Sequence, residues 1–329
     1  MSSPSSTLNR SLGLVGLTAT GVCSMIGASI FYLFFVGQDI GIAAEQLLQG
    51  IYNSYTLLSV PLFIIAANFM SLGAMSDKLM QFCNALVGRF RGGMGHVNVI
   101  SSLIFAGMSG SAVADAVGIG KLTIEMMVKD GRYTPSYAAA ITAATAVIGP
   151  IIPPSIPMVL FALVSDASIG YLFLAGVIPG ILMALAMSIV NWRMAIKHNF
   201  PVEAPVPLRE LPRITWESLP ALMMPVVLLG GIYGGVMTPT EAAAVAATYA
   251  LIVSWLLYRS VTLRATYASL ISSARNTASV GILIAGALVF NYVVTIENIP
   301  VDIKLWLDGL HLNMWQFLLM VNQLLLVLG

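Results

Sequence analysis

Glycine and serine are concentrated in one short run of the chain, close to an acidic side chain. Residues 107–112 read Gly-Met-Ser-Gly-Ser-Ala, and Asp115 follows soon after. Small residues at this density predict a sharp turn, whose backbone groups cannot all be satisfied inside a helix. Ser109, Gly110 and Ser111 therefore offer hydroxyls and free backbone groups that could bind a small ion or solute.

A second run is rich in proline. Residues 148–157 read Ile-Gly-Pro-Ile-Ile-Pro-Pro-Ser-Ile-Pro and lie inside an apolar segment, residues 133–164. Proline lacks the backbone N–H that a continuing helix needs, so the helix is predicted to unwind here. The residues of this predicted break that could contribute to a site are Gly149, Pro150, Pro153, Pro154 and Ser155.

A broken helix opposite a turn can form a binding site in the middle of a membrane. Half-helix N-termini point the positive ends of their dipoles at an anion, and unwound carbonyls and hydroxyls can ligate a small cation. No Arg or Lys is predicted in the membrane core, so an anionic ligand would be held by dipoles, hydroxyls and bound cations. The alternative is a pair of helix kinks that serve only packing.

Asp115 has two interpretations. An acidic residue at membrane depth is a candidate for ion or substrate binding. Four residues after the turn, it could instead cap the returning half-helix, where a negative charge favours the N-terminal dipole. The sequence slightly favours the cap.

Ser109 also fits a Gly-x-Ser-Gly nucleophile turn, which raises the alternative of an intramembrane serine protease. That chemistry needs a general base within hydrogen-bond reach of the serine. The three histidines, His96, His198 and His311, lie at predicted membrane edges or in loops. The sequence therefore favours a protein that is not an enzyme, with a passive channel as a further alternative.

The elements that must position these residues are membrane helices. The chain has 329 residues, 58% of them hydrophobic and 9% charged, and its mean hydropathy is +0.90. Soluble domains carry about 25% charged residues, so the solvent of this chain is mostly a lipid bilayer. The formal net charge of +1 argues against a nucleic-acid partner. The predicted fold class is an all-α polytopic membrane protein.

Apolar runs separated by polar breaks give the predicted spans. Residues 96–127 differ, because their short apolar stretches meet at the Gly-Ser turn, and we predict a re-entrant hairpin there. The predicted spans are near residues 11–37, 57–73, 133–164, 171–192, 219–236, 242–258, 276–295 and 314–329.

The distribution of basic residues supports the hairpin. Lys and Arg collect in cytoplasmic loops, and a hairpin that enters and leaves on one face puts every basic residue except Lys304 on one side. A full crossing would scramble this sorting. We therefore predict a cytoplasmic N-terminus.

The longest polar connection divides the chain. Residues 193–218 combine four prolines with mixed charges, and they are predicted to form a cytoplasmic linker. Residues 1–192 would form a first structural repeat, and residues 219–329 an incomplete second one.

Three motifs, in this order, resemble a known family. They are His-Val-Asn-Val at residues 96–99 leading into residues 107–115, the proline run at residues 148–157, and Thr-Pro-Thr-Glu-Ala-Ala-Ala at residues 238–244. Together they are similar to the large membrane subunit, the permease, of tripartite ATP-independent periplasmic (TRAP) transporters.

The resemblance implies sodium-driven uptake of a small organic anion, a C4-dicarboxylate or a sugar acid such as sialic acid. It implies an inverted-repeat fold of the elevator type in the bacterial inner membrane, with a periplasmic solute-binding protein and a small membrane subunit as partners. It also implies that the hairpin and the break hold sodium and substrate, with sodium at Ser109, Ser111 and Gly149. Sodium would act as a coupling ion, and no other cofactor is expected.

The sequence departs from the family pattern in its second half. Family members carry a second hairpin and a second break with a Thr-Pro-Pro element, but no further Pro-Pro follows Ser155 here. We therefore expect a C-terminally incomplete permease that does not transport alone. The N-terminal apolar stretch is also shorter than is usual in the family.

Overall fold

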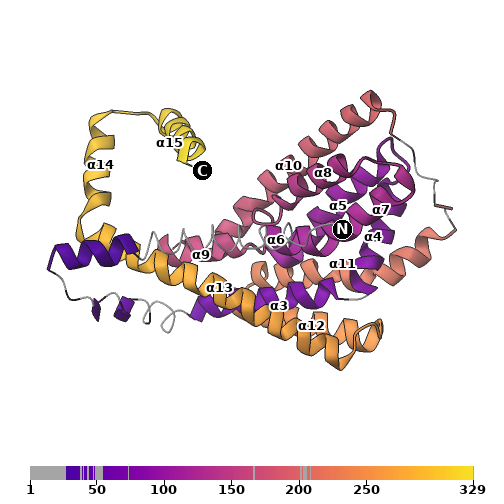
Figure 1. Cartoon of the computed structure of the whole chain (residues 1–329), viewed down its shortest axis with the longest axis horizontal. Coiled ribbons are helices and arrows are strands. Elements are labelled where there is room, and N and C mark those ends of the chain that lie inside the picture. Colours follow the sequence, from indigo (N-terminus) through magenta and orange to yellow (C-terminus); the bar gives the residue numbers. More distant parts are fainter. Residues whose placement is uncertain are drawn as a thin grey trace, which may run out of the picture. The chain divides into compact units, whose positions relative to one another are not determined.

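The structure is a computed structural model, and all its regular elements are helices. It describes residues 27–37, 39, 41, 42, 44–46, 48, 55–72, 74–165, 167–200, 202, 206, 207 and 209–328. Within these ranges, extended pairing is limited to one isolated antiparallel bridge between Arg91 and Val202. The predicted all-α class is confirmed (Figure 1).

The chain divides into two compact units, residues 53–280 and residues 1–52 with 281–329. The elements of the first unit, of which the last runs on into the second unit, are η1 Tyr55–Leu58, α3 Ser59–Ser71, α4 Ala74–Val87, α5 Gly93–Ser109, α6 Ala112–Asp115, η2 Ala116–Gly120, α7 Lys121–Val128, η3 Lys129–Gly131, α8 Pro135–Ala146, α9 Ile156–Ser165, α10 Ile169–Lys197, α11 Leu211–Tyr233, α12 Pro239–Ile252, η4 Val253–Leu257 and α13 Leu263–Ile296. The second unit also holds a helix over residues 27–35, α14 Ile299–Gly309 and α15 Met314–Leu328.

Four helices in the described part of the chain are long and apolar enough to cross a membrane. They are α10, α11, α12 together with η4, and α13. They coincide with the predicted spans near residues 171–192, 219–236, 242–258 and 276–295. The first predicted span, residues 11–37, lies mostly outside the described residues. The polar connection predicted at residues 193–218 is shorter in the structure, because α10 runs on to Lys197 and α11 already begins at Leu211.

Local chemistry explains where several helices begin. Thr134 and Thr238 each precede a proline at the first helical position and cap their helices through the side-chain oxygen. Glu241 completes a capping box, since its carboxylate accepts the Thr238 N–H at 2.7 Å. Proline at the first helical position loses no hydrogen bond, so both starts follow from local sequence.

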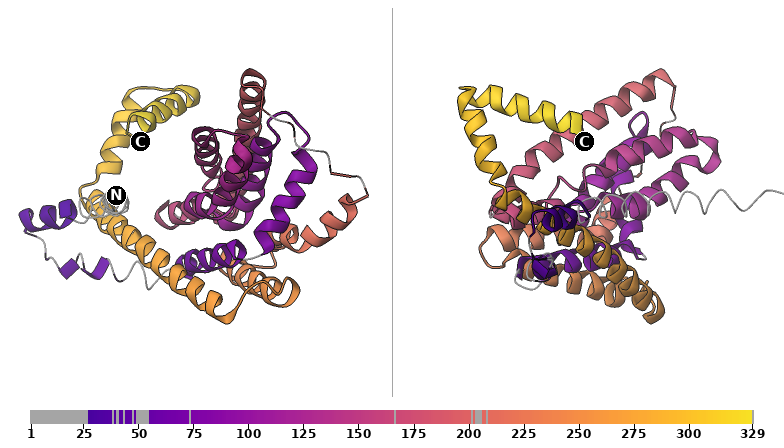
Figure 2. Two further views of the ribbon diagram at one scale, coloured as in Figure 1. Left: turned by 45° about the vertical axis from the view of Figure 1, so that its right-hand side comes forward. Right: turned by 60° about the vertical axis from the view of Figure 1, so that its left-hand side comes forward.

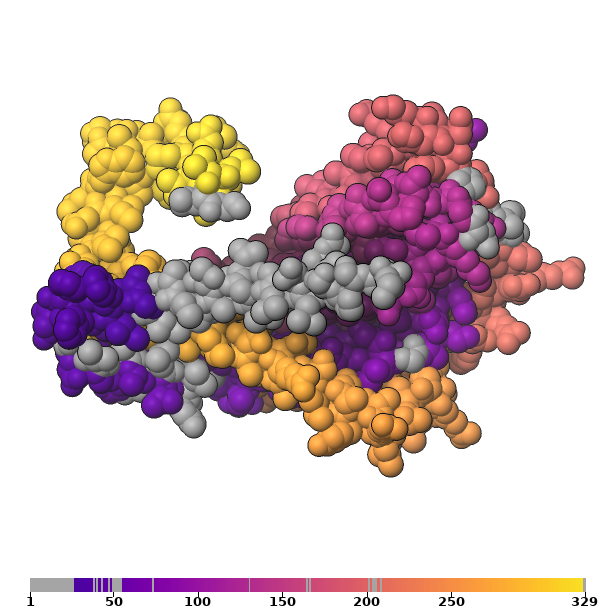
Figure 3. Space-filling model, viewed as in Figure 1, coloured from indigo at the N-terminus to yellow at the C-terminus, as the bar shows by residue number. Residues whose placement is uncertain are grey.

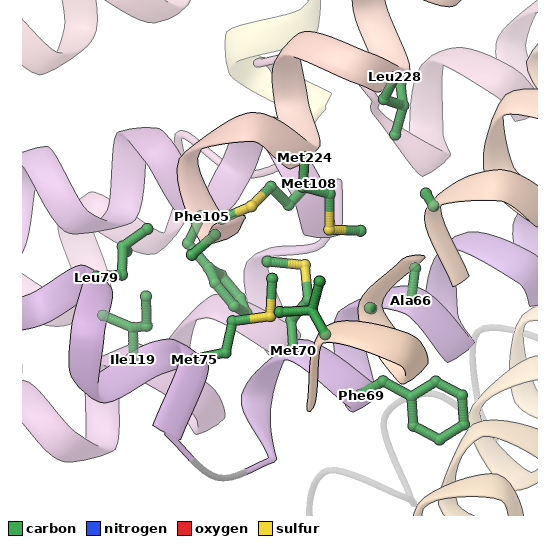
Figure 4. Packing of buried hydrophobic residues seen from close by; sticks show 14 of the residues in the cluster. Ala66, Phe69, Met70, Met75, Leu79, Phe105, Met108, Ile119, Met224 and Leu228 are labelled. Carbon is green, nitrogen blue, oxygen red and sulfur yellow. The ribbon is translucent and has the colours of Figure 1, made fainter. Parts of the chain in front are cut away.

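The largest buried cluster joins α3, α4, α5, α11 and α12. Methionines converge in its centre from four helices, with Met70, Met75, Met108 and Met224 at 0–1% exposure. Figure 4 shows these side chains with Phe105 between them. Flexible thioethers fill irregular gaps between helices, which suits a junction of several helix axes.

Small residues set the closest helix contacts. The face of α12 against α3 carries Ala242, Ala243, Ala246 and Ala250, all buried. The two helices run side by side in every view (Figure 2). Alanine lets backbones approach closely, which is how membrane helices gain packing energy without a hydrophobic drive.

A second small-residue face, on α10, supports the proline run. A Cβ placed on Gly176 would lie 3.4 Å from the Met158 sulfur, and one on Gly180 would lie 3.8 Å from the Ile151 side chain. In the space-filling view α10 also packs against α8 (Figure 3). The α10 helix therefore packs directly against the segment between α8 and α9.

Candidate functional site

The Gly-Ser run forms the turn between α5 and the returning helices. Helix α5 ends at Ser109, and Gly110 takes a left-handed conformation with φ 61°. Ser111 is extended and caps α6, because its hydroxyl accepts the Ala114 N–H at 3.3 Å. The arms α5 and α7 contact each other. The structure thus contains the helical hairpin, while its depth in a membrane stays a prediction.

The proline run interrupts the helix, as its residues predict. Helix α8 ends at Ala146 and α9 begins at Ile156, with turns and bends between them. Ser155 closes the gap, because its hydroxyl donates to the Pro150 carbonyl and accepts the Met158 N–H at 3.2 Å. The Ser155 hydroxyl is therefore committed to holding the start of α9.

The hairpin turn and the break touch each other through backbone atoms. The Ile156 N–H donates to the Gly110 carbonyl at 3.3 Å. A Cβ on Gly110 would lie 3.0 Å from the Pro154 carbonyl carbon, and a Cβ on Gly149 would lie 3.0 Å from the Ser111 carbonyl carbon. A side chain has no room at Gly110, and a Cβ at Gly149 would fit only if the neighbouring backbone moved by a few tenths of an ångström.

Pro153 belongs to the same contact. Its carbonyl oxygen lies 3.9 Å from the position of a Cβ on Gly107, one turn before the end of α5. The structure therefore brings the predicted residues of the turn and of the break into one assembly.

A cavity of about 770 Å³ opens beside this assembly. Ser109, Ser111 and Ile156 line it, whereas break residues 149–155 are not among its lining residues. The Ser109 hydroxyl is buried and has no hydrogen-bond partner among the described residues. A buried hydroxyl without a partner costs about 1–3 kcal/mol, so a ligand that bonded to it would recover free energy.

Other polar residues of the cavity were not found by sequence reasoning. They are Asn68 and Ser71 from α3, Lys121 and Glu125 from α7, and Ser272, Asn276 and Ser279 from α13. The sequence held a signal for the α13 group, because spacings of four and three place residues 272, 276 and 279 on one helix face. Such a polar stripe in an apolar helix marks a surface that avoids lipid.

Lys121 lines the cavity together with Ser109. It is one of the basic residues predicted on the cytoplasmic side, and nothing in the sequence places it in the same cavity as the turn. Its ammonium group lies 3.9 Å from Glu125, at the limit of an ion pair, and both side chains are largely exposed. The Lys121 ammonium group, which is only loosely paired, therefore supplies a positive charge at the cavity wall.

Asp115 points away from the cavity. It is 1% exposed and lies near the Ser102 hydroxyl, and one carboxylate oxygen has no hydrogen-bond partner. Buried polar groups of α5 and α8 continue from Ser102, which donates to Thr145 at 3.4 Å. The cap of α6 is Ser111, so the interpretation of Asp115 as the cap is wrong.

No base is hydrogen-bonded to Ser109, whose hydroxyl has no partner among the described residues, although Lys121 and Glu125 line the same cavity. None of the residues that line the cavity is a histidine. His96 lies 13 residues before Ser109 on the same helix, which corresponds to roughly 20 Å along the axis. The geometry needed for a serine nucleophile is absent from the described part of the chain.

Comparison with known proteins identifies the family. Residues 12–329 match the family described as "Tripartite ATP-independent periplasmic transporter, DctM component". The sialic acid TRAP transporter large permease protein SiaM of Vibrio cholerae is 38% identical over 321 residues, which cover 96% of this chain and 75% of SiaM.

Two further relatives are also TRAP transporter permeases. The C4-dicarboxylate TRAP transporter large permease protein DctM of Pseudomonas aeruginosa is 40% identical over 84% of this chain and 64% of its own length. The sialic acid TRAP transporter permease protein SiaT of Haemophilus influenzae is 35% identical over 93% of this chain and 50% of its own length. The chain thus spans between half and three quarters of these relatives, which are permeases and not enzymes. With its four apolar helices and these matches, the chain is a multi-pass membrane protein of the DctM family of TRAP transporter permeases.

Proposed function

We propose that this chain is the large permease component of a secondary transporter that uses a sodium gradient to take up a small organic anion. Relatives are named for sialic acid, C4-dicarboxylates, isethionate and 2,3-diketo-L-gulonate. These solutes share a small size and an acidic group. An organic anion of this class is therefore the proposed substrate, and the bacterial inner membrane is the proposed location.

The unpartnered Ser109 hydroxyl at the cavity wall carries the proposal. Sodium is a hard cation, and such ions take oxygen ligands from hydroxyls and backbone carbonyls. Ser109 and Ser111 supply such oxygens where the helix is interrupted, and Gly149 packs against the Ser111 backbone. We place the sodium ion at these residues, with Pro150, Pro153, Pro154 and Ser155 as the support that keeps the turn in position.

Lys121 is the proposed contact for the anionic group. The helix dipole of α9 is less available than the sequence suggested, because its Ile156 and Met158 N–H groups already have acceptors inside the protein. Lys121 is paired to Glu125 only at 3.9 Å, so a carboxylate or sulfonate could compete for the ammonium group.

The remaining components follow from the family. A tripartite periplasmic system implies a solute-binding protein that delivers the anion and a small membrane subunit, and both are proposed partners. The cytoplasmic N-terminus, predicted from the basic residues, is part of this proposal.

Uptake into proteoliposomes tests the function. The permease is reconstituted with its partner proteins, and uptake of labelled sialic acid and succinate is followed with an inward sodium gradient or with potassium instead. We expect uptake of one anion, and only with sodium. Flux that is equal without the gradient would contradict the proposal and would support a passive channel.

A binding measurement tests the site separately. Sodium should raise the melting temperature of the purified chain. In Ser109→Ala, the sodium concentration that gives half of this rise should be about ten-fold higher, as expected for the loss of one ligand. Ser165→Ala is the matched control, because Ser165 bonds to the Phe161 carbonyl outside the cavity. Equal sodium dependence in both variants would show that Ser109 does not bind the ion.

A further inference from the structure

A second cavity, of about 730 Å³, lies between α4, α11 and the α12–η4 segment. It shares no lining residue with the cavity at Ser109. Its two ends differ in chemistry. Lys78, Arg213 and Glu217 line one end, and the apolar side chains of Pro220 and Met223, farther along α11, line the other. Ten residues of helix separate Arg213 from Met223, which corresponds to about 15 Å.

Among the residues that line the charged end, basic groups outnumber acidic ones, and a second carboxylate, Glu210, lies near Arg213 outside the lining. Glu217 is the one acidic residue of the lining, and it pairs with the Lys78 ammonium group at 2.5 Å and with the Arg213 Nε at 2.8 Å. Two basic groups therefore share one carboxylate. The Arg213 side chain is 82% exposed, so its other guanidinium N–H groups remain open to an anion. A guanidinium group offers five donors in a planar fork that suits phosphate.

Hydrogen bonds fix the walls of this cavity. The Tyr258 hydroxyl donates to the Glu217 carbonyl at 2.7 Å, and the Tyr249 hydroxyl donates to the Pro220 carbonyl at 2.8 Å. Ser218 donates to the Lys78 carbonyl at 2.8 Å and ties α11 to α4. The cavity is therefore held by three helices and does not depend on a ligand to form.

The position of the cavity along the helices matches the edge of a bilayer. The start of α11 and the end of the α12–η4 segment meet here, and both are candidate membrane spans. Trp216 is 76% exposed beside the charged end. Tryptophan, tyrosine and basic residues gather at the headgroup level of a membrane. The apolar end of the cavity then lies at the level of the acyl chains.

We propose that this cavity binds an anionic phospholipid, with its phosphate on Arg213 and Lys78 and an acyl chain along Pro220 and Met223. Charge complementarity selects the headgroup, because the lining has one more basic than acidic residue. The apolar end selects a lipid over a soluble anion. A lipid in this place links α4, α11 and α12. Under the predicted topology it belongs to the cytoplasmic leaflet, where anionic lipids raise the negative surface potential.

Native mass spectrometry of the chain purified in mild detergent tests the proposal. The probes are phosphatidylglycerol and phosphatidylcholine with the same acyl chains, added at equal concentration. We expect retained phosphatidylglycerol, and about five-fold weaker retention in Arg213→Gln, the factor expected for one basic residue at a membrane surface. Arg193→Gln is the control, because Arg193 is an exposed residue of α10 outside this cavity.

Two further arms separate lipid from other occupants. Met223→Trp should fill the apolar end and remove the retained lipid, while the melting temperature without added lipid stays within a few degrees of the parent. Glycerol phosphate, which lacks acyl chains, should not compete with the lipid.

Three results would overturn the proposal: equal retention of the two lipids, equal retention in the two arginine variants, or full competition by glycerol phosphate. Cross-linking of a Trp216→Cys variant to another membrane protein, in membranes where no lipid co-purifies, would also contradict the proposal and would assign the cavity to a protein partner.

Discussion

Gly110 is the residue on which the contact between hairpin and break depends. It combines a left-handed φ of 61° with an approach to the Pro154 carbonyl that excludes any Cβ. Its own carbonyl accepts the Ile156 N–H. The absence of a side chain therefore determines how close Ser109 and Ser111 lie to the start of α9.

Gly110→Ala is expected to destabilise the protein by more than about 2 kcal/mol, because strain from positive φ and a clash with backbone add together. Gly131→Ala is the matched control, since Gly131 also has a positive φ (+66°) but nothing within 4 Å of a Cβ. It should cost about 1 kcal/mol, from backbone strain alone. Thermal unfolding in detergent measures both, and equal losses would contradict the packing argument.

Lys121 is predicted to act on the anion and not on sodium. Lys121→Gln should raise the KM for the transported anion about ten-fold, as expected for loss of a charged hydrogen bond. The sodium concentration for half-maximal uptake should stay unchanged. Lys129→Gln is the control, because Lys129 lies outside the cavity. A ten-fold change in the sodium requirement of Lys121→Gln would place the residue at the ion instead.

At the scale of elements, close helix packing decides where the site is built. Small residues on one helix allow both close contacts: the alanines of α12 face α3, and the glycines of α10 receive Ile152 of the break and Met158 of α9. Helix α3 in turn contributes Asn68 to the cavity, and Asn68 donates to Ser273 of α13 at 2.7 Å. A disturbance of α3 should therefore reach the cavity.

Ala246→Leu tests this link. The larger side chain has no room against α3, so we expect a loss of about 1–3 kcal/mol from overpacking, together with weaker anion uptake. Thr248→Leu places the same leucine side chain on an exposed position of the same helix and should leave stability within about 0.5 kcal/mol. Unfolding and uptake are measured on both variants. Unchanged stability in Ala246→Leu would show that α3 and α12 can move apart to accept the larger side chain, and would contradict the prediction.

For the molecule as a whole, the orientation in the membrane decides which cavity opens toward which side. The α12–η4 segment, Pro239–Leu257, is a candidate span with Glu241 at its start. Arg259 follows its end. The sorting of basic residues predicts that the end near Arg259 faces the cytoplasm.

Cysteine labelling tests the orientation. In a background with Cys23→Ser and Cys83→Ala, a membrane-impermeant maleimide should label Val236→Cys in intact spheroplasts. It should label Ser260→Cys only after permeabilisation. Both positions are exposed in the structure, so accessibility differs only by side of the membrane. The opposite labelling pattern would invert the predicted topology.

The residues alone were enough to predict the features that depend on local chemistry. Long apolar runs require helices in a bilayer, and the prolines at residues 148–157 interrupt a helix wherever they occur. Glycines at the turn and the Thr-Pro starts of α8 and α12 act within a few residues. The membrane class, the hairpin turn, the break and the family were therefore accessible from residues alone. The sodium ion and the second repeat stay predictions.

Only the tertiary structure decided which of the residues share a cavity. Lys121 and Asn276 join Ser109 there, while Asp115, only four residues from Ser111, faces the Ser102 side of the hairpin. The identity of a neighbour across two helices depends on the rotation and depth at which the helices pack. That choice is made by contacts far apart in sequence, such as the alanines of α12 on α3, and no local pattern encodes it.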